Sequence, residues 1–433
     1  MTDIITKENA LLSEKYHKFK HKSGLDVYVI PKKMTTSYAI FATRYGAIDN
    51  KFKHAGEEKY TVVPDGIAHF LEHKLFECED GTDAFELFAK TGASANAFTT
   101  NTMTAYIFSC TDNFYESLEI LLNFVTHPYF SKATVEKEQG IIGQEIRMYD
   151  DHPGARLNRS LFSAIYEKNK MNIDVAGTIE SISQITPELL YKCHEIFYNL
   201  NNMALCVCGD IDTRLVEKVC DKILVEIAPP FDVIRDTEDE DEPKEVFKKR
   251  EACYLDVAKP IFAIGIKDLN ISSDPNVRTK KSFGIEILNE MLFSQSTKFY
   301  NDLYDKNLIA QALVASGGHS KYCSYNTISS ESSDPEKIYK LFVEYIEKTK
   351  KEGLSKEDFE LSKRTVLASN IKNYDSVENI GDNFIFTLFD DSDLLDETEI
   401  ISSITFEYIE KLFYEIYREE YYTMAVVYPQ EEE

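Results

Sequence analysis

The segment Gly66-Ile-Ala-His69-Phe-Leu-Glu72-His73-Lys-Leu-Phe76 decides the architecture expected of this chain. Its apolar residues recur at helical spacing directly after Pro64-Asp65-Gly66, which predicts a helix over 67–76 with Asp65 as its N-terminal cap. His69 and His73 are four residues apart, so their imidazoles lie one above the other on the same face of this helix. Two ligands of one metal ion need this spacing, and the segment is therefore a candidate metal-binding helix.

The carboxylate between the two histidines adds a catalytic group. From its place on the helix, Glu72 reaches a water on the metal and serves as general base. The order His-x-x-Glu-His is the inverse of the His-Glu-x-x-His motif of zinc peptidases. The competing interpretation is a pair of histidines at helical spacing in a chain that holds no metal.

A third ligand is expected from a second helix, predicted over 131–150. A catalytic zinc takes three protein ligands and keeps one position open, and we expect Glu145 to be the third. Glu138 lies two turns earlier on nearly the same face, where it accepts the free N–H of a ligand histidine and supports the catalytic site. Without the histidines, Glu138 and Glu145 would be interpreted as a solvated helix face.

The length and net charge of the chain limit the classes of protein to which it can belong. A chain of 433 residues exceeds the size of a single core, so two domains are expected. The net charge is -26, from 74 acidic and 48 basic residues, which disfavours nucleic acid as a partner. Solvated helix faces that keep the protein soluble account for most of this charge, and an acidic interior would favour basic peptides.

Cysteine usage and the absence of apolar segments favour a cytoplasmic protein. The eight cysteines form no Cys-x-x-Cys pair, as expected of reduced thiols. Residues 1–19 lack the pattern of a signal or transit peptide. No stretch approaches 18 uninterrupted apolar residues, so we expect no membrane partner.

The chain divides into two similar parts with an acidic linker between them. We predict a metal-binding α+β domain over 1–228, a linker over 229–250 and a second, metal-free α+β domain over 251–433. Ser355-Lys-Glu-Asp-Phe-Glu echoes Ser131-Lys-Ala-Thr-Val-Glu, and Ser369 falls where Glu145 does, so the second domain repeats the first without its ligands. The expected strands span 25–30, 37–42, 93–99, 104–108, 203–208 and 261–266, and the expected helices span 67–76, 113–126, 131–150, 186–198, 282–293, 296–303, 335–348 and 355–372.

Four motifs in order resemble one protein family. Gly66-Ile-Ala-His-Phe-Leu-Glu-His73, Gly92-Ala-Ser-Ala-Asn-Ala-Phe-Thr99, Glu138-x6-Glu145-Ile146 and Gly177-Thr-Ile-Glu-Ser-Ile182 are similar to those of the pitrilysin or insulinase-type zinc peptidases. The closer resemblance is to half-size bacterial members related to mitochondrial processing peptidase, including the pair associated with elongation factor P modification. The motifs carry this resemblance over the first half of the chain, and the length of the chain and the order of its predicted elements extend it to the second half. It implies two homologous domains, each a mostly antiparallel sheet covered by helices, that form half of a clamshell.

The resemblance also implies roles for individual residues. It gives Zn²⁺ as the cofactor, His69, His73 and Glu145 as its ligands, and Glu72 and Glu138 as the catalytic and supporting carboxylates. It makes 94–98 an edge strand onto which an extended substrate adds, with Ser94 in that strand and Asn96 and Ala97 beside the scissile bond. The expected activity is hydrolysis of peptides or unstructured segments inside a closed chamber.

One departure from the family pattern concerns the second half. The family usually carries an Arg and a Tyr there, which polarise the substrate carbonyl, but the corresponding stretch 302–311 has neither in place. Tyr304, Lys306 and Tyr322 are the candidates to replace them, and spacing selects none. A homodimer, or a heterodimer whose second subunit supplies the pair, is expected. The alternatives are a processing-peptidase subunit that is inactive without its partner, and a non-catalytic scaffold.

Overall fold

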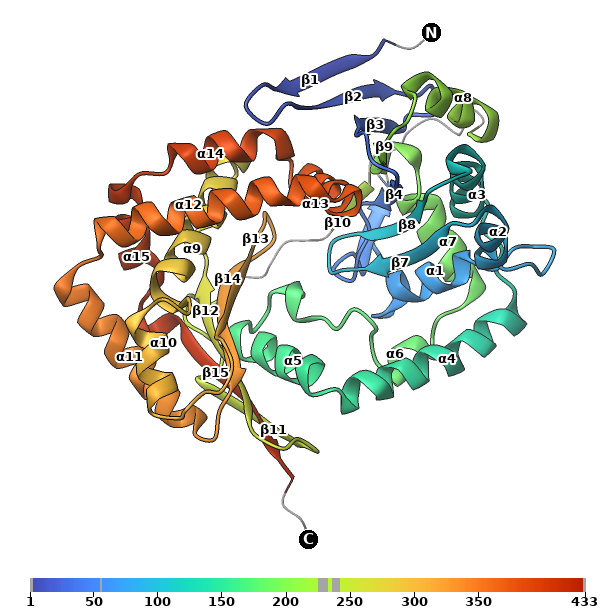
Figure 1. Cartoon of the computed structure of the whole chain (residues 1–433). Helices are drawn as coiled ribbons and strands as arrows, with labels where there is room; N and C mark the ends of the chain where they lie inside the picture. The colour runs from blue at the N-terminus through green and yellow to red at the C-terminus, as the bar shows by residue number, and fades with distance from the viewer. Residues whose placement is uncertain (1–2, 55–56, 225–232, 236–241, 431–433) are drawn as a thin grey trace.

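The computed structural model describes residues 3–54, 57–224, 233–235 and 242–430, and Figure 1 shows two units, each a sheet with helices packed on it. The first unit runs from blue to green and the second from yellow to red. This arrangement confirms the prediction of an α+β fold with two domains. No helix of the described residues has both the length and the apolar character needed to cross a lipid bilayer.

The first unit is built on a sheet with seven strands among the described residues, in the order β1-β2-β3-β9-β4-β8-β7. Neighbouring strands are antiparallel except for the parallel pair β3 and β9. The strands are β1 (Ile5–Asn9), β2 (Glu14–Lys20), β3 (Asp26–Pro31), β4 (Ser37–Thr43), β7 (Ser94–Thr99), β8 (Thr104–Cys110) and β9 (Met203–Gly209). The helices are α1 (Ile67–Leu75), α2 (Ala84–Thr91), α3 (Phe114–Thr126), α4 (Lys132–Asp151), α5 (Pro153–Ile165), α6 (Ile179–Ile182), α7 (Pro187–Phe197) and α8 (Thr213–Ile223).

The second unit repeats this plan with five strands in its described part, in the order β11-β15-β12-β14-β13. The pair β11 and β15 is parallel and the other pairs are antiparallel. The strands are β11 (Arg250–Leu255), β12 (Ile261–Asp268), β13 (Val314–His319), β14 (Ser324–Glu331) and β15 (Tyr422–Pro429). The helices are α9 (Pro275–Phe293), α10 (Lys298–Asp305), α11 (Pro335–Glu352), α12 (Lys356–Lys372), α13 (Val377–Phe389), α14 (Glu397–Ser403) and α15 (Phe406–Ile416).

The two units correspond element by element. The order β3-β9-β4-β8-β7 in the first sheet matches β11-β15-β12-β14-β13 in the second, including the position of the single parallel pair. In chain order α1 corresponds to α9, α4 to α12 and α5 to α13. The predicted internal repeat is therefore confirmed, and each sheet ends at a free edge strand, β7 or β13, that follows the first helices of its unit.

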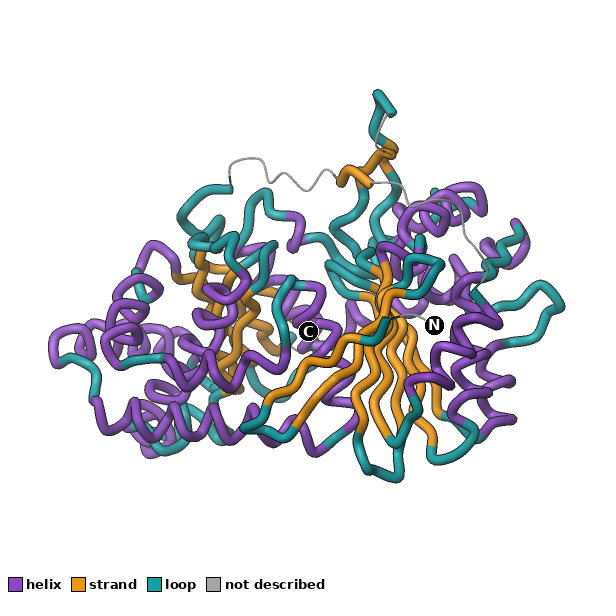
Figure 2. Tube along the Cα trace, turned by 90° about the horizontal axis from the view of Figure 1, so that it is seen from above, coloured by secondary structure: helices purple, strands orange, loops and turns teal. Residues whose placement is uncertain are grey.

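Each sheet buries one face under its own helices and the other under a helix of the opposite unit. The large core of the first unit lies beneath α1, α3, α4 and α7, and that of the second beneath α9, α11, α12 and α15. On the opposite faces, α13 packs on β4 and β9 of the first sheet, whereas α5 packs on β12 and β15 of the second. Figure 1 shows these exchanged helices between the two sheets, and Figure 2 shows helical segments between the two sheets as seen from above. The exchange joins the units into one body.

The segment predicted to be a linker contacts both units where it is described. Residues 229–232 and 236–241 of that prediction lie outside the described residues. Between them, β10 (Val233–Arg235) pairs with β5 (Lys51–His54), which also pairs with β6 (Thr61–Val62), and Arg235 forms an ion pair of 2.9 Å with Asp49. Glu242 accepts the backbone N–H groups of 167–169 and pairs with the buried Lys267 of β12. The domain boundaries at 228 and 250 stay a prediction.

The exchanged helix α13 should contribute strongly to stability. Phe384 is 4% exposed and packs on the rings of Tyr16 and Tyr28, with centroids 5.2 and 4.9 Å away. Phe384→Ala leaves a cavity under the first sheet, so we expect a loss of about 3–5 kcal/mol. Phe386→Ala, on the same helix at 46% exposure, should cost less than about 1 kcal/mol. Urea unfolding followed by circular dichroism measures the stability of both variants. Equal unfolding midpoints would contradict the larger contribution assigned to Phe384.

Candidate metal centre

The start of α1 is fixed by contact with a distant loop. Gly66 is the N-cap residue, at a φ of 88°, and a Cβ there would lie 2.5 Å from the carbonyl oxygen of Ala176. Ser181 Oγ donates to the carbonyl of Asp65 at 2.8 Å, so the Gly177–Ile182 motif holds the helix start. The prediction that Asp65 caps the helix is wrong, because α1 has no side-chain cap and the Asp65 carboxylate accepts from Asn50 instead.

Packing of α1 on α4 brings the predicted ligands together. α4 begins at a capping box formed by Ser131 and Thr134 and passes beside α1. His69 Nε2 lies 3.7 Å from Glu145 Oε1, and His73 Nε2 lies 3.5 Å from Glu145 Oε2. Among the described residues, this is the one group of three or more potential ligands whose atoms all lie within 4.8 Å of one another.

These distances fit a tetrahedral metal better than a set of hydrogen bonds. An N–H···O bond spans about 2.7–3.2 Å, shorter than either His–Glu145 distance. A tetrahedral zinc with ligand bonds of about 2.0–2.2 Å separates its ligand atoms by about 3.3–3.6 Å. Two imidazoles and one carboxylate are also the donor set of catalytic zinc sites with an open position. The residues present therefore fit zinc.

Glu138 orients one of the histidines. Its Oε1 lies 3.1 Å from His73 Nδ1, so Nδ1–H donates to the carboxylate and Nε2 keeps its lone pair toward Glu145. Burial alone lowers the pKa of His73, but the Glu138 hydrogen bond and the nearby carboxylates of Glu72 and Glu145 outweigh it and raise that pKa. The structure thus brings Glu138 to the place the sequence predicted for it.

The other histidine is held neutral. Burial, followed by the charge of His73, lowers the pKa of His69 to about 4. Neutral imidazole is the form that ligates a metal. His69 Nδ1 is buried and, within the described part of the chain, has no hydrogen-bond partner.

Glu72 is buried beside the ligands and held by β7. Thr99 Oγ1, at the end of this strand, donates to Glu72 Oε2 at 2.6 Å. Burial raises the pKa of Glu72, which brings a carboxylate closer to the range of an effective proton acceptor. Sequence reasoning missed the role of Thr99, although Thr99 closes the Gly92–Thr99 motif.

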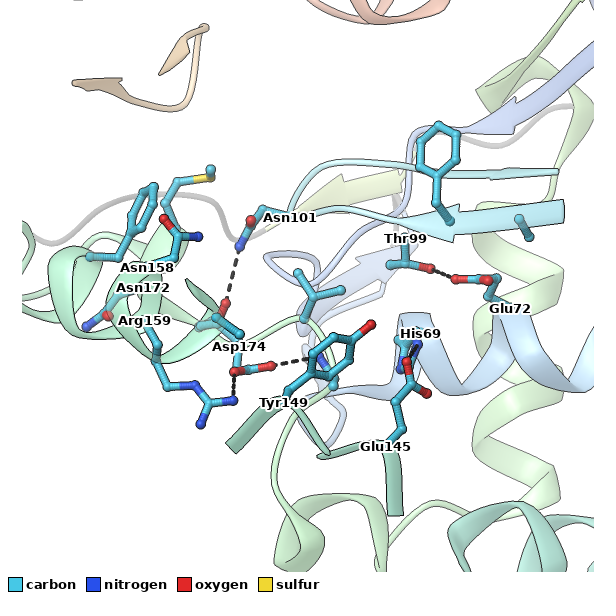
Figure 3. A pocket seen from close by; sticks show the side chains of 18 of the residues that line it. His69, Glu72, Thr99, Asn101, Glu145, Tyr149, Asn158, Arg159, Asn172 and Asp174 are labelled. Carbon is cyan, nitrogen blue, oxygen red and sulfur yellow. Dashed lines mark hydrogen bonds and ion pairs between the residues drawn. The ribbon is translucent and has the colours of Figure 1, made fainter. Parts of the chain in front are cut away.

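A cavity of about 620 Å³ opens on this cluster (Figure 3). His69, Glu72, His73 and Glu145 line one side, and Asn96 and Ala97 of the edge strand β7 line another. Asn96 Oδ1 accepts the backbone N–H of Ala97 at 2.9 Å. Ser94, at the exposed start of β7, is not among the lining residues.

Most of the remaining wall comes from α5 and the loop that follows it, which sequence reasoning did not select, and Tyr325 of β14 adds a residue of the second unit. Arg159 of α5 pairs with Asp150 and with Asp174, each at 2.5 Å, as Figure 3 shows for Asp174. Tyr149, one turn beyond Glu145, also lines the cavity, and burial together with the Glu145 carboxylate raises its pKa. The exchanged position of α5 puts Arg159 and the loop that carries Asp174 here, and no local motif indicates it.

The three candidates for the missing Arg and Tyr lie elsewhere. Tyr304 is an exposed residue of α10, and Lys306 is the C-cap of the same helix. Tyr322 is half-buried near the guanidinium groups of Arg44 and Arg235. None of the three is among the residues that line the cavity.

Comparison with known proteins places this architecture in one family. Residues 54–179 match the model of Insulinase (Peptidase family M16), and residues 184–366 match the model of the Peptidase M16 inactive domain. A Bacillus subtilis protein named "Uncharacterized zinc protease YmfH" is 37% identical over 418 residues, which cover 96% of each chain. The chain belongs to peptidase family M16. Its relatives in this family include several named zinc proteases, which suggests zinc as the metal.

Solved structures of M16 proteins share the whole fold. An M16-like peptidase from Alicyclobacillus acidocaldarius has a TM-score of 0.90 at 29% identity, and the match covers 96% of this chain and 99% of that one. Pitrilysin has a TM-score of 0.74 at 14% identity, and the match covers 100% of this chain and 47% of pitrilysin. The second similarity concerns the fold alone, and it agrees with the expectation that this chain forms half of a clamshell.

The metal centre is tested by the role of Glu138. Purified protein should carry one zinc per chain, and Glu138→Gln should weaken zinc binding about 10- to 100-fold because His73 loses its orienting acceptor. Glu136→Gln, on the same helix with a 61% exposed side chain, is the matched control. Competition with a chelator measures the affinities. Equal affinity of both variants would contradict the role of Glu138.

Proposed function

We propose that this M16 chain is a zinc-dependent endopeptidase that hydrolyses peptides or unstructured protein segments. The observation that carries the proposal is the meeting of two histidines, Glu145 and the buried carboxylate of Glu72 at one side of an open cavity. Family membership and the zinc protease names of its relatives support it. The eight cysteines are all free thiols, which supports a reducing compartment such as the cytoplasm.

The chain's own residues divide the chemical work. His69, His73 and Glu145 would hold the zinc, which when bound supplies a Lewis acid and lowers the pKa of water. Glu72 accepts a proton from the attacking water and delivers it to the leaving amine. Thr99 keeps the Glu72 carboxylate aimed at the cavity by its hydrogen bond of 2.6 Å, and Glu138 keeps His73 in the required tautomer.

The edge strand β7 offers a place for an extended substrate. At the hairpin end, the Thr100 N–H donates to the Met103 carbonyl, so Thr100 and every second residue before it bond to β8. In an antiparallel pair the residues between them turn their backbone N–H and C=O groups the other way. The backbone groups of Ala95, Ala97 and Thr99 therefore face the free edge. A peptide added to this edge would run past Glu72. It must replace Asn96 Oδ1 as the acceptor for the Ala97 N–H, which gives Asn96 a part in substrate binding, whereas Ser94 would contact only the far end of the peptide.

A specific observation favours the alternative of a subunit that needs a partner. Arg159 is the one lysine or arginine among the residues that line the cavity, and its guanidinium is already paired with two aspartates. A developing oxyanion therefore finds no free lysine or arginine among the described residues that line the cavity. A homologous subunit that forms the second half of a clamshell would supply the missing Arg and Tyr, whereas another copy of this chain carries the same departure at 302–311.

Digestion of a panel of unstructured peptides, read by mass spectrometry, tests the proposal. The chain is assayed alone and with a homologous subunit, while its mass in solution is measured in parallel. Cleavage by the chain alone supports a self-sufficient enzyme, and cleavage only with the partner supports the heterodimer. Absence of cleavage in both, with zinc bound, would favour the scaffold.

The general base gives the sharpest prediction. Glu72→Gln should lower kcat about 10²- to 10⁴-fold, because an amide accepts no proton from water, while zinc content stays unchanged. Glu86→Gln, an exposed position on the next helix, should keep full activity. His73→Ala should lose both zinc and activity. Rates for Glu72→Gln equal to those of the unmodified chain would remove Glu72 from the mechanism.

A further inference from the structure

One tyrosine reaches the candidate metal centre from the helix that carries Glu145. Tyr149 follows Glu145 by four residues on α4, so the two side chains lie one turn apart on the same face of the helix. Both line the cavity that opens on the centre. Figure 3 shows the ring of Tyr149 with its hydroxyl end directed toward His69 and away from Arg159. The phenol therefore presents its hydroxyl to the ligand cluster.

The Tyr149 hydroxyl is a protonated donor beside the carboxylates of the centre. The ordinary pKa of a tyrosine is about 10, so this group carries its proton at neutral pH. Burial, followed by the carboxylate of Glu145 and then that of Glu72, raises the pKa of Tyr149 further. The side chain is 39% exposed, so a bound substrate can reach the hydroxyl.

Other donors of the cavity wall already have acceptors. Thr99 Oγ1 donates to the proposed general base at 2.6 Å, and Asn101 Nδ2 donates to the carbonyl of Ile173 at 3.2 Å. The guanidinium of Arg159 is paired with two aspartates. A substrate atom that becomes negative beside the ligand cluster therefore meets Tyr149 as a donor directed toward that cluster.

The second unit has neither this tyrosine nor the ligands at the corresponding positions. A cavity of about 340 Å³ lies there at the place equivalent to the first, with walls from α9, α12, α13 and the end of β13. Ser369 lines it where the repeat places Glu145, and Asn373, four residues later, lines it where the repeat places Tyr149. The phenol thus occurs in the repeat that gathers the candidate ligands.

The position of Tyr149 relative to Glu72 suits a role in the hydrolysis proposed above. Water enters beside Glu72, which accepts its proton, and the substrate carbonyl oxygen becomes an oxyanion on the far side of the reacting carbon. In the view of Figure 3, Glu72 and Tyr149 lie on opposite sides of His69. On the basis of the proposed function, we propose that the Tyr149 hydroxyl donates a hydrogen bond to this oxyanion. The phenol keeps its proton, and Glu72 remains the group that transfers protons.

Removal of the hydroxyl alone tests this role. Tyr149→Phe should lower kcat about 10²- to 10³-fold with little change in KM, because the donor acts on the oxyanion and not on the bound substrate. Calorimetry gives a readout apart from turnover. A phosphinic peptide, whose tetrahedral anion resembles the oxyanion, should bind the zinc-loaded variant about tenfold or more weakly, at unchanged zinc affinity. Tyr414→Phe, at an exposed position of α15 outside the cavity lining, is the matched control.

Binding of an uncleaved peptide separates this role from a contact with the substrate. In the Glu72→Gln chain, the peptide should bind equally with and without Tyr149→Phe. Equal losses for peptide and phosphinic analogue, unchanged binding of the analogue, no binding of the analogue by the unmodified zinc-loaded chain, or a loss of zinc affinity would each overturn the inference. A chain that binds no zinc, or that cleaves no peptide even with a homologous subunit, would refute the proposed function itself and the inference with it. Thermal melting of each variant checks that it is folded.

Discussion

Each central sheet has two apolar faces, and the helices that follow it in sequence cover only one. Burial of the second face is the constraint on which the rest of the structure depends, because an exposed sheet face would leave large apolar side chains in water. The fold buries these second faces because each unit lends one helix to the other: α5 of the first unit covers the second sheet, and α13 of the second unit covers the first. Neither unit can bury its core fully without the other.

The exchange also creates both cavities. α5 covers the second sheet while its Arg159 lines the first cavity, and α13 covers the first sheet while its Asn383 lines the second. In each unit, residues of the exchanged helix and of the free edge strand line the same cavity. Cavities at equivalent places are thus a consequence of sheet burial, and the side chains on α1 and α9 decide what each one does.

Sequence reasoning found the candidate ligands where local periodicity and the needs of a metal coincide. Helical spacing selected His69 and His73, the need for a third ligand selected Glu145, and the three side chains lie together in the structure, while their role as metal ligands stays a prediction. Sequence reasoning failed where a contact between residues far apart in the chain fixes the position of an element. An amphipathic pattern shows that a helix has an apolar face but not which sheet covers that face, so Arg159 and Asp174 could not be placed beside the ligands. Asp65 precedes α1 as a capping residue would, but the contact of Gly66 with Ala176 fixes the helix start instead.

The two cavities resolve the repulsion of clustered carboxylates in different ways. In the first, Glu72, Glu138 and Glu145 surround two imidazoles, and the zinc proposed for this centre would offset the like charges that burial otherwise makes costly. Such a metal would then stabilise the folded chain. In the second, serines line the cavity where the repeat of the fold would put a histidine and a glutamate, at Ser282 and Ser369, so fewer charged side chains meet there. Glu286 is exposed to solvent, and burial raises the pKa of Glu397, which favours its uncharged form. The same backbone arrangement thus gathers the candidate ligands of a metal in one unit and fewer charges in the other.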